Sequence, residues 1–224
     1  MKAAILFSGG KDSTYAAYLA KKKGMELTCL ISLFSKNKAS YMFHTPSIKQ
    51  VKKQAKVMGL PLVTKKTAGI KEQELEDLTE VIKQVKDKYH IDTIVTGALH
   101  SEYQASRIQA ICDKLNLKCF NPLWHKDEIE YLKELVDNNF KVIITGVFAY
   151  PLNQSWLGRI IDKKFIDEVS QLKVKYKIHA AGEGGEFETF VLNCPLFKRE
   201  LVVKKFKDVK EGENSWRREI KVSA

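Results

Sequence analysis

The sequence feature that most constrains the fold is an apolar segment followed by one serine, two glycines and the start of a helix. Residues 3–7 are wholly apolar, as expected of a strand buried on both faces of a sheet. Six residues follow at once: Ser8, Gly9, Gly10, Lys11, Asp12 and Ser13. Glycines let a backbone approach a phosphate group closely, and the free N–H groups of a helix start form an anion site. The segment therefore predicts a phosphate-binding turn, with an ordinary tight turn and helix cap as the alternative.

The side chains of this turn suit the phosphates of a nucleotide. Lys11 adds a point charge for phosphate oxygens, and Ser8 and Ser13 can donate hydrogen bonds. Asp12 would be out of place in a plain anion site, but it suits a cation held between phosphates. We therefore name Asp12 as the candidate metal ligand.

The spacing of the turn separates it from two other phosphate loops. Neither GxxxxGK(S/T), the loop of γ-phosphate chemistry, nor GxGxxG, the dinucleotide loop, occurs in the sequence. SGGKDS instead resembles the PP-loop of the N-type ATP pyrophosphatases, which attack the α-phosphate of ATP and release pyrophosphate. The resemblance implies ATP as the nucleotide, with Mg²⁺ beside it.

Strand-like and helical segments alternate up to residue 120, and this alternation indicates the fold class. Strands are expected at residues 3–7, 27–33, 62–64, 91–96 and 117–120, and helices at residues 12–23, 48–58, 72–89 and 101–115. Repeated strand–helix units of this length predict an α/β fold with a doubly wound parallel sheet of about five strands.

Residues 122–124, Pro-Leu-Trp, interrupt this alternation, and we place a domain boundary there. The division gives an ATP-binding domain at residues 1–122 and a smaller α+β substrate and catalytic domain at residues 123–224. Within the second domain, helices are expected at residues 127–138 and 162–176, and strands at residues 141–147, 190–192, 201–206 and 219–222.

The segment at residues 40–46, SYMFHTP, follows the second strand and is expected beside the nucleotide. Ligands of an open parallel sheet bind beyond the carboxyl ends of its strands. Met42 and Phe43 would then cover a purine ring, and His44 and Thr45 would offer polar contacts. Alternatively, the two apolar residues belong to the core and His44 merely precedes a helix.

The segment at residues 97–107, GALHSEYQASR, follows the fourth strand and begins a helix for which Ser101 is a candidate N-cap. Tyr103 and Arg107 are four residues apart, so they share one face of the first helical turns. A helix start that carries Tyr and Arg at this edge of the sheet indicates a binding role, while an exposed stacking pair is the alternative.

A third segment, AGEGGEFET at residues 181–189, places three carboxylates among three glycines. Such a loop suits a pre-organised set of acceptors for a cation, an amine or a proton in transfer. A plain hairpin turn is the alternative. Upstream, Arg159 in the segment WLGR is a further candidate for binding phosphate.

Charge and cysteine content bear on partners and compartment. Thirty-eight basic residues against 27 acidic ones give a net charge of +11, which attracts polyanions without specifying their kind. The four cysteines are scattered and form no metal-binding spacing, so we expect reduced thiols, no zinc site and a cytoplasmic location. No apolar run is long enough to cross a membrane, and the N-terminal residues do not read as a signal peptide.

Six motifs occur in an order that resembles the diphthine–ammonia ligase family. They are SGGKDS, SYMFHTP, GALHSEYQASR, the PLW at residues 122–124, WLGR and GEGGEFET, and they extend to about residue 190. The resemblance implies a HUP-type domain followed by a smaller α+β domain. It also implies the last step of diphthamide synthesis, in which ATP activates the carboxylate of diphthine, a modified histidine of translation elongation factor 2, and ammonia amidates it.

The implied reaction divides the candidate residues into three groups. A carboxylate from residues 181–189, called the acidic loop below, would hold ammonium and accept its proton. Lys11 would stabilise charge on the phosphates. The catalytic candidates are Lys11, Glu183, Glu186 and Glu188. The ATP-binding candidates are Ser8, Gly9, Gly10, Lys11, Asp12, Ser13, Met42, His44 and Gly97. The substrate-binding candidates are Thr45, Tyr103, Arg107 and Arg159.

Three other functions stay open at this point. The charge permits a tRNA-modifying PP-loop enzyme, although scattered cysteines argue against thiolation. A non-catalytic nucleotide-binding module would leave the acidic loop without a purpose. A ligase for a small metabolite would share the chemistry and differ in the acceptor. We expect free ammonia as the nitrogen source, because the sequence contains no glutaminase domain, and no requirement for nucleic acid.

Overall fold

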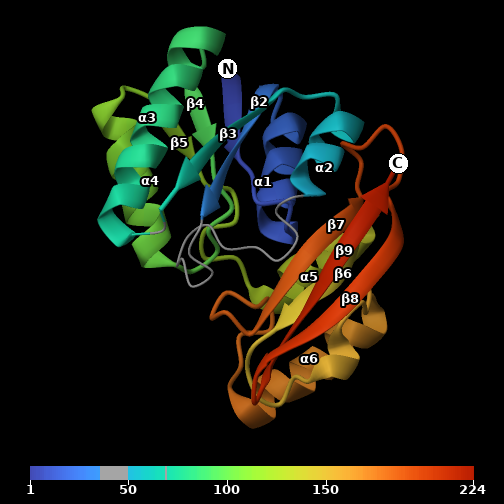
Figure 1. Cartoon of the computed structure of the whole chain (residues 1–224). Coiled ribbons are helices and arrows are strands. Elements are labelled where there is room, and N and C mark those ends of the chain that lie inside the picture. Colours follow the sequence, from blue (N-terminus) through green and yellow to red (C-terminus); the bar gives the residue numbers. More distant parts are fainter. Residues whose placement is uncertain (36–49, 69) are drawn as a thin grey trace.

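The structure of the chain, a computed structural model, describes residues 1–35, 50–68 and 70–224, and these residues form two separate β-sheets (Figure 1). The first sheet has the strand order β3-β2-β1-β4-β5, and every neighbouring pair is parallel. Its strands are β1 (Lys2–Leu6), β2 (Glu26–Ser35), β3 (Leu62–Thr67), β4 (Thr93–Val95) and β5 (Lys118–Phe120). The expected parallel sheet of about five strands is confirmed.

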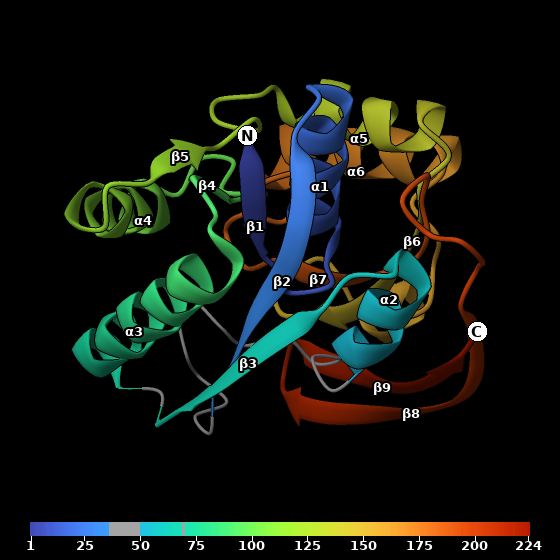
Figure 2. The ribbon, with the colours of Figure 1, turned by 90° about the horizontal axis from the view of Figure 1, so that it is seen from above.

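Helices cover both faces of this sheet, as a doubly wound fold requires (Figure 2). The helices on one face are α1 (Lys11–Lys22) and α2 (Val51–Met58), and those on the other are α3 (Lys71–Tyr89) and α4 (Glu102–Lys114). The strand order reverses between β1 and β4. Ligands of open α/β sheets bind at such a switch point, so the fold directs attention to the residues that follow these two strands.

The second sheet is antiparallel and has the strand order β7-β6-β9-β8. Its strands are β6 (Lys141–Val147), β7 (Phe187–Asn193), β8 (Val202–Gly212) and β9 (Ser215–Ser223). On one face lie α5 (Glu128–Asp137), α6 (Lys163–Tyr176) and the short 3-10 helix η2 (Gln154–Trp156). The other face packs in part against α2, through a cluster that includes Val57, Phe190 and Ile220.

β6 has the bounds that the sequence predicted, residues 141–147, and the other three strands of the second sheet are longer than the sequence indicated. β7 begins at Phe187 rather than at residue 190, and β8 and β9 extend toward each other and pair along most of their length. Most of β8 is exposed and rich in lysine, so the alternation of apolar and polar residues that would reveal a half-buried strand is missing there. The helix expected from residue 48 is described only from Val51, because residues 36–49 lie outside the described part of the chain.

The two sheets are joined by a common core. Tyr15 of α1 packs in one apolar cluster with Leu132 of α5 and Val191 of β7. The hydroxyl of Tyr15 donates a hydrogen bond of 2.8 Å to Glu134, and that of Tyr18 donates one of 2.8 Å to Asn138. The division of the chain at residue 122 stays a prediction, because this core is built from both sides of the boundary. No helix within the described residues is long and apolar enough to cross a membrane.

Phe140 provides a test of this shared core. Its side chain is buried, and its ring lies 5.2 Å from the ring of Tyr15 and 5.7 Å from that of Tyr18, centre to centre. Phe140→Ala should lower the free energy of unfolding by about 3–5 kcal/mol, since it opens a cavity between α1 and the second sheet. Denaturant unfolding followed by circular dichroism measures this loss.

Val174→Ala is the matched control, because Val174 is 74% exposed on α6. It should change the same free energy by no more than about 0.5 kcal/mol. Two separate unfolding transitions, of which Phe140→Ala shifts only one, would contradict a common core.

Candidate active site

A cavity of about 270 Å³ opens where β1 and β4 end and the acidic loop of the second region approaches them. Among the predicted site residues, those that line it are Ser8, Gly10, Lys11, Asp12, Ser13, Gly97, Glu183 and Glu188. Residues on both sides of the predicted boundary at residue 122 therefore contribute to one site, as the motifs implied.

Hydroxyl groups organise the glycine turn after β1. The N–H of Ser8 donates to Ser13 Oγ at 3.2 Å, and the N–H of Gly10 donates to Ser8 Oγ at 3.3 Å. The hydroxyl of Thr14 donates to the carbonyl of Gly10 at 2.8 Å. Gly9 has a φ of +82°, which L side chains rarely adopt. These contacts hold a tight turn at the N-terminus of α1, the arrangement that binds phosphate in other folds.

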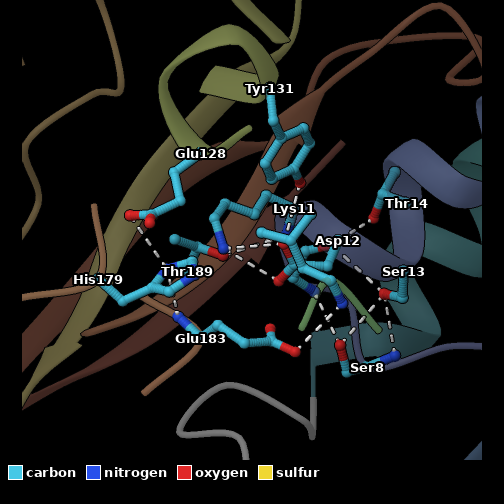
Figure 3. Close-up of polar contacts among 12 residues, drawn as sticks. Ser8, Lys11, Asp12, Ser13, Thr14, Glu128, Tyr131, His179, Glu183 and Thr189 are labelled. Carbon is cyan, nitrogen blue, oxygen red and sulfur yellow. Dashed lines mark hydrogen bonds and ion pairs between the residues drawn. The ribbon is translucent and has the colours of Figure 1, made fainter. Parts of the chain in front are cut away.

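Lys11 and Asp12 form an ion pair at the floor of this turn (Figure 3). The ammonium of Lys11 lies 2.9 and 3.0 Å from the two carboxylate oxygens of Asp12, and the Lys11 side chain is buried. Tyr131 of α5 donates its hydroxyl to Asp12 Oδ1 at 3.0 Å. Burial, and then the charge of Asp12, raise the pKa of Tyr131 well above its usual value. Tyr131 is therefore a neutral donor that fixes the orientation of Asp12.

The strand β7 holds the other side of the turn. The N–H of Lys11 donates to Thr189 Oγ1 at 3.1 Å, and the N–H of Val191 donates to the carbonyl of Gly9 at 3.1 Å. Gln54 of α2 is fully buried, and its amide donates to the carbonyls of both Gly9 and Val191 at 2.9 Å. The turn is thus connected to the second sheet directly and through one glutamine.

Gly97 lies where the end of β4 meets the start of α1. A Cβ atom at this position would lie 2.6 Å from the backbone carbon of Asp12 and 2.9 Å from the N–H nitrogen of Ser13. Because the obstructing atoms belong to the backbone, only glycine allows this approach. Gly97 therefore positions the glycine turn at residues 8–13, which is called the nucleotide turn below. Any direct contact between Gly97 and ATP stays a prediction.

The three glutamates of the acidic loop occupy different environments. Glu183 reaches toward Asp12, and its Oε1 accepts the N–H groups of Leu99, His100 and Ser101 at 3.1–3.2 Å (Figure 3). Burial, followed by the charge of Asp12, raises the pKa of Glu183. Glu188 also lines the cavity. Glu186 is buried, and its Oε1 accepts the N–H of His179 at 2.7 Å.

His179 lies next to the acidic loop and was not among the predicted residues. Its Nδ1 accepts the N–H of Glu183 at 3.4 Å and lies 3.5 Å from Glu128 Oε2 (Figure 3). Burial lowers the pKa of this imidazole despite the neighbouring carboxylates of Glu128 and Glu186. The side chain therefore supports the start of the loop as a neutral ring.

The remaining predicted residues fall outside the cavity or outside the described part. The guanidinium of Arg107 stacks on Tyr103 at 3.6 Å from the ring centre, and Gln104 and Ile108 of the same helix line the cavity instead. Arg159 pairs with Glu168 at 2.7 Å and stacks on Trp156. Met42, His44 and Thr45 lie outside the described residues. The binding roles assigned to these residues stay predictions.

Besides His179, three residues that hold the site were missed at the level of sequence: Gln54, Tyr131 and Thr189. Gln54 offered a signal, since it stands among Val51, Ala55 and Met58 on the apolar face of its helix, and a polar residue on such a face must find a partner. Thr189 is the last residue of the predicted acidic segment. Tyr131 gave no local signal, because its partner is 119 residues away.

The fold and the cavity define a class of nucleotide-binding α/β enzyme, in which a glycine turn at a helix N-terminus faces a lysine and a group of carboxylates. Comparison with known proteins specifies the class further. The family model of the diphthamide synthase N-terminal domain matches residues 1–119, and that of the diphthamide synthase C-terminal domain matches residues 127–222.

Individual proteins agree with the family models. The chain is 35% identical to the diphthine–ammonia ligase of Mus musculus over 222 residues, which covers 91% of this chain and 83% of the mouse protein. The identity is 34% for the proteins of the same name from Bos taurus and Homo sapiens, with the same coverage. The chain therefore belongs to the diphthamide synthase family and is an enzyme of the ligase class.

Gln54 allows the link between the nucleotide turn and β7 to be tested. Gln54→Leu keeps the volume of the side chain but removes both donated hydrogen bonds, which should raise the KM for ATP roughly tenfold and lower the free energy of unfolding by about 1–3 kcal/mol. Steady-state kinetics and denaturant unfolding measure the two effects.

Gln109→Leu is the matched control, because Gln109 is exposed on α4 and its amide donates a hydrogen bond to Asp113 of the same helix. This variant should leave both quantities close to those of the unmodified enzyme. If Gln54→Leu also leaves the KM for ATP unchanged, the two hydrogen bonds donated by Gln54 have no influence on the nucleotide turn.

Proposed function

We propose that the chain is a diphthine–ammonia ligase that adenylates the carboxylate of diphthine on translation elongation factor 2 and amidates it with ammonia. AMP and pyrophosphate are the other products. The observation that carries the proposal is the meeting of the nucleotide turn and the acidic loop at one cavity, in a chain that belongs to the diphthamide synthase family.

The nucleotide turn is the proposed site for the phosphates of ATP. The helix N-terminus and Lys11 supply positive potential, and Ser8 and Ser13 supply hydroxyl groups that line the cavity. Gly9 and Gly10 keep this surface free of side chains. We assign residues 1–122 to ATP binding and residues 123–224 to the acceptor and the acidic loop, as the expected domain boundary divides them.

Mg²⁺ fits the donor chemistry of the same site. The carboxylate of Asp12 lines the cavity, its side chain is 30% exposed, and carboxylate and phosphate oxygens are the ligands that this ion prefers. Asp12 would hold the ion together with the phosphates, and the ion would neutralise charge that develops on the leaving pyrophosphate. Tyr131 would keep Asp12 oriented through its 3.0 Å hydrogen bond.

The proposed chemistry has two steps. The acceptor carboxylate attacks the α-phosphate, the bond to the β-phosphate breaks, and an acyl-adenylate forms while Lys11 stabilises the phosphate charge. Ammonia then attacks the acyl carbon and AMP leaves. Ammonium must lose a proton before its nitrogen can attack, and in this proposal a carboxylate of the acidic loop accepts that proton.

The family and the charge of the chain support the proposed acceptor and the proposed compartment. The related proteins are named for diphthine and ammonia, and we propose elongation factor 2 as the protein that carries the diphthine. The net charge of +11 suits a large anionic partner. All four cysteines are free thiols, which agrees with a reaction in the cytoplasm.

Product analysis tests which bond of ATP breaks. Enzyme, ATP, Mg²⁺, ammonium and diphthine-bearing elongation factor 2 should release AMP and pyrophosphate in equal amounts, because the adenylated carboxylate must displace pyrophosphate. Anion-exchange chromatography of the nucleotides measures the ratio.

The control reaction contains elongation factor 2 without diphthine and should release neither product. Stoichiometric ADP and phosphate would contradict the proposed first step. AMP formation with a free carboxylic acid, and none with the diphthine-bearing factor, would retain the adenylation and reject the protein acceptor.

A further inference from the structure

The three glutamates of the acidic loop differ in what their carboxylates already bind. Glu186 does not line the cavity, and its side chain is buried against its own loop. A Cβ atom on Gly184 would lie 2.7 Å from Glu186 Oε1, so the backbone of Gly184 passes directly over this carboxylate. Together with the hydrogen bond from His179, this contact makes Glu186 the residue that shapes the loop.

Glu183 combines a fixed carboxylate with access to the cavity. The three N–H groups of Leu99, His100 and Ser101 all donate to Oε1. Oε2 accepts no hydrogen bond from any residue within the described part of the chain, and the side chain lines the cavity. Three N–H donors on one oxygen leave the other in a defined position, as a pre-organised binding group requires.

The charges around Glu183 favour a cation. The charged side chains that influence Glu183 most are Asp12 and Lys11, and these two pair with each other. Glu183 therefore adds a negative charge that no cationic side chain pairs with in residues 1–35, 50–68 and 70–224. A small cation beside Oε2 would be attracted by this charge.

We infer that Glu183 is the catalytic residue that receives the nitrogen donor, with ammonium bound at Oε2 within the cavity. This inference rests on the proposed function and specifies which carboxylate performs its second step. It also assigns two roles to one side chain, since Oε1 holds the turn that leads into α4 while Oε2 meets the substrate.

The step balances with the groups at hand. Ammonium transfers one proton to Glu183 Oε2, and the nitrogen lone pair forms a bond to the carbonyl carbon of the acyl-adenylate. The bond between that carbon and the AMP oxygen breaks, and AMP leaves with the electron pair. The nitrogen loses a second proton to water as the amide forms, and Glu183 then returns its proton to water.

Hydroxylamine separates binding of a cation from the rest of the reaction. It is largely neutral near neutral pH and attacks acyl-adenylates to give hydroxamates, so it needs no carboxylate to remove a proton. Glu183→Gln keeps an oxygen for the three N–H groups but removes the charge. The ratio of kcat/KM for ammonium to kcat/KM for hydroxylamine should fall by a factor of roughly 10²–10⁴, the usual effect of a positioned acid–base group.

Glu188→Gln tests the other carboxylate that lines the cavity, and the inference predicts an unchanged ratio in this variant. Glu213→Gln is the matched control, because Glu213 is exposed in the turn between β8 and β9 and does not line the cavity, so it should change neither rate. An equal loss with both nucleophiles in Glu183→Gln would show that Glu183 acts only through the turn before α4, and would overturn the inference. A fall in the ratio for Glu188→Gln alone would transfer the role to Glu188.

Glu183→Ala separates the structural effect of losing the hydrogen bonds from the effect of losing the charge. A failure of the proposed function itself gives a different result. The alanine variant loses the three hydrogen bonds as well as the charge, so the rate with hydroxylamine should fall in it and persist in Glu183→Gln. If the unmodified enzyme forms no hydroxamate on diphthine-bearing elongation factor 2, the proposed acceptor chemistry is wrong, whatever Glu183 does.

Discussion

The hydrogen bonds on the carbonyl of Gly9 are the interaction on which the rest of the site depends. This carbonyl accepts from Val191 of β7 and from the buried amide of Gln54. A buried carbonyl without partners would cost about 1–3 kcal/mol, so the nucleotide turn is stable in this form only while β7 and α2 lie against it. The position of the nucleotide turn therefore depends on its contacts with β7 and α2, which are distant from it in the sequence.

This dependence brings the sites of the two proposed chemical steps together. β7 begins two residues after the last glycine of the acidic loop, at Phe187, and its Thr189 bonds the N–H of Lys11. Glu183 in turn bonds the backbone that leads into α4. The turn proposed to bind phosphate and the carboxylates proposed to receive the amine are thereby held at one cavity by short chain segments. A reactive acyl-adenylate formed there would have little distance to cross before it met the nitrogen donor.

The sequence predicted those parts of the structure that depend on local patterns. Apolar residues 3–7 followed by two glycines predicted β1 and the turn, and Ser101 was expected as an N-cap and accepts the N–H of Gln104 at 3.3 Å. The long hairpin of β8 and β9 was underestimated, because exposed lysines hide its periodicity. Tyr131 and Gln54 were missed because their contacts exist only after distant segments pack. The sequence offered no reason to distinguish the three glutamates of the acidic loop. In the structure, the backbone of Gly184 covers the carboxylate of Glu186 and so separates this residue from the other two.

Transfer of isotopically labelled nitrogen tests the central claim most directly. Enzyme, ATP, Mg²⁺ and ammonium that carries the heavy nitrogen isotope are incubated with diphthine-bearing elongation factor 2, and the modified peptide is analysed by tandem mass spectrometry. The account predicts a single labelled nitrogen in the amide of the diphthine side chain, with none when ATP is omitted. Consumption of ATP without labelled nitrogen in that side chain would contradict it.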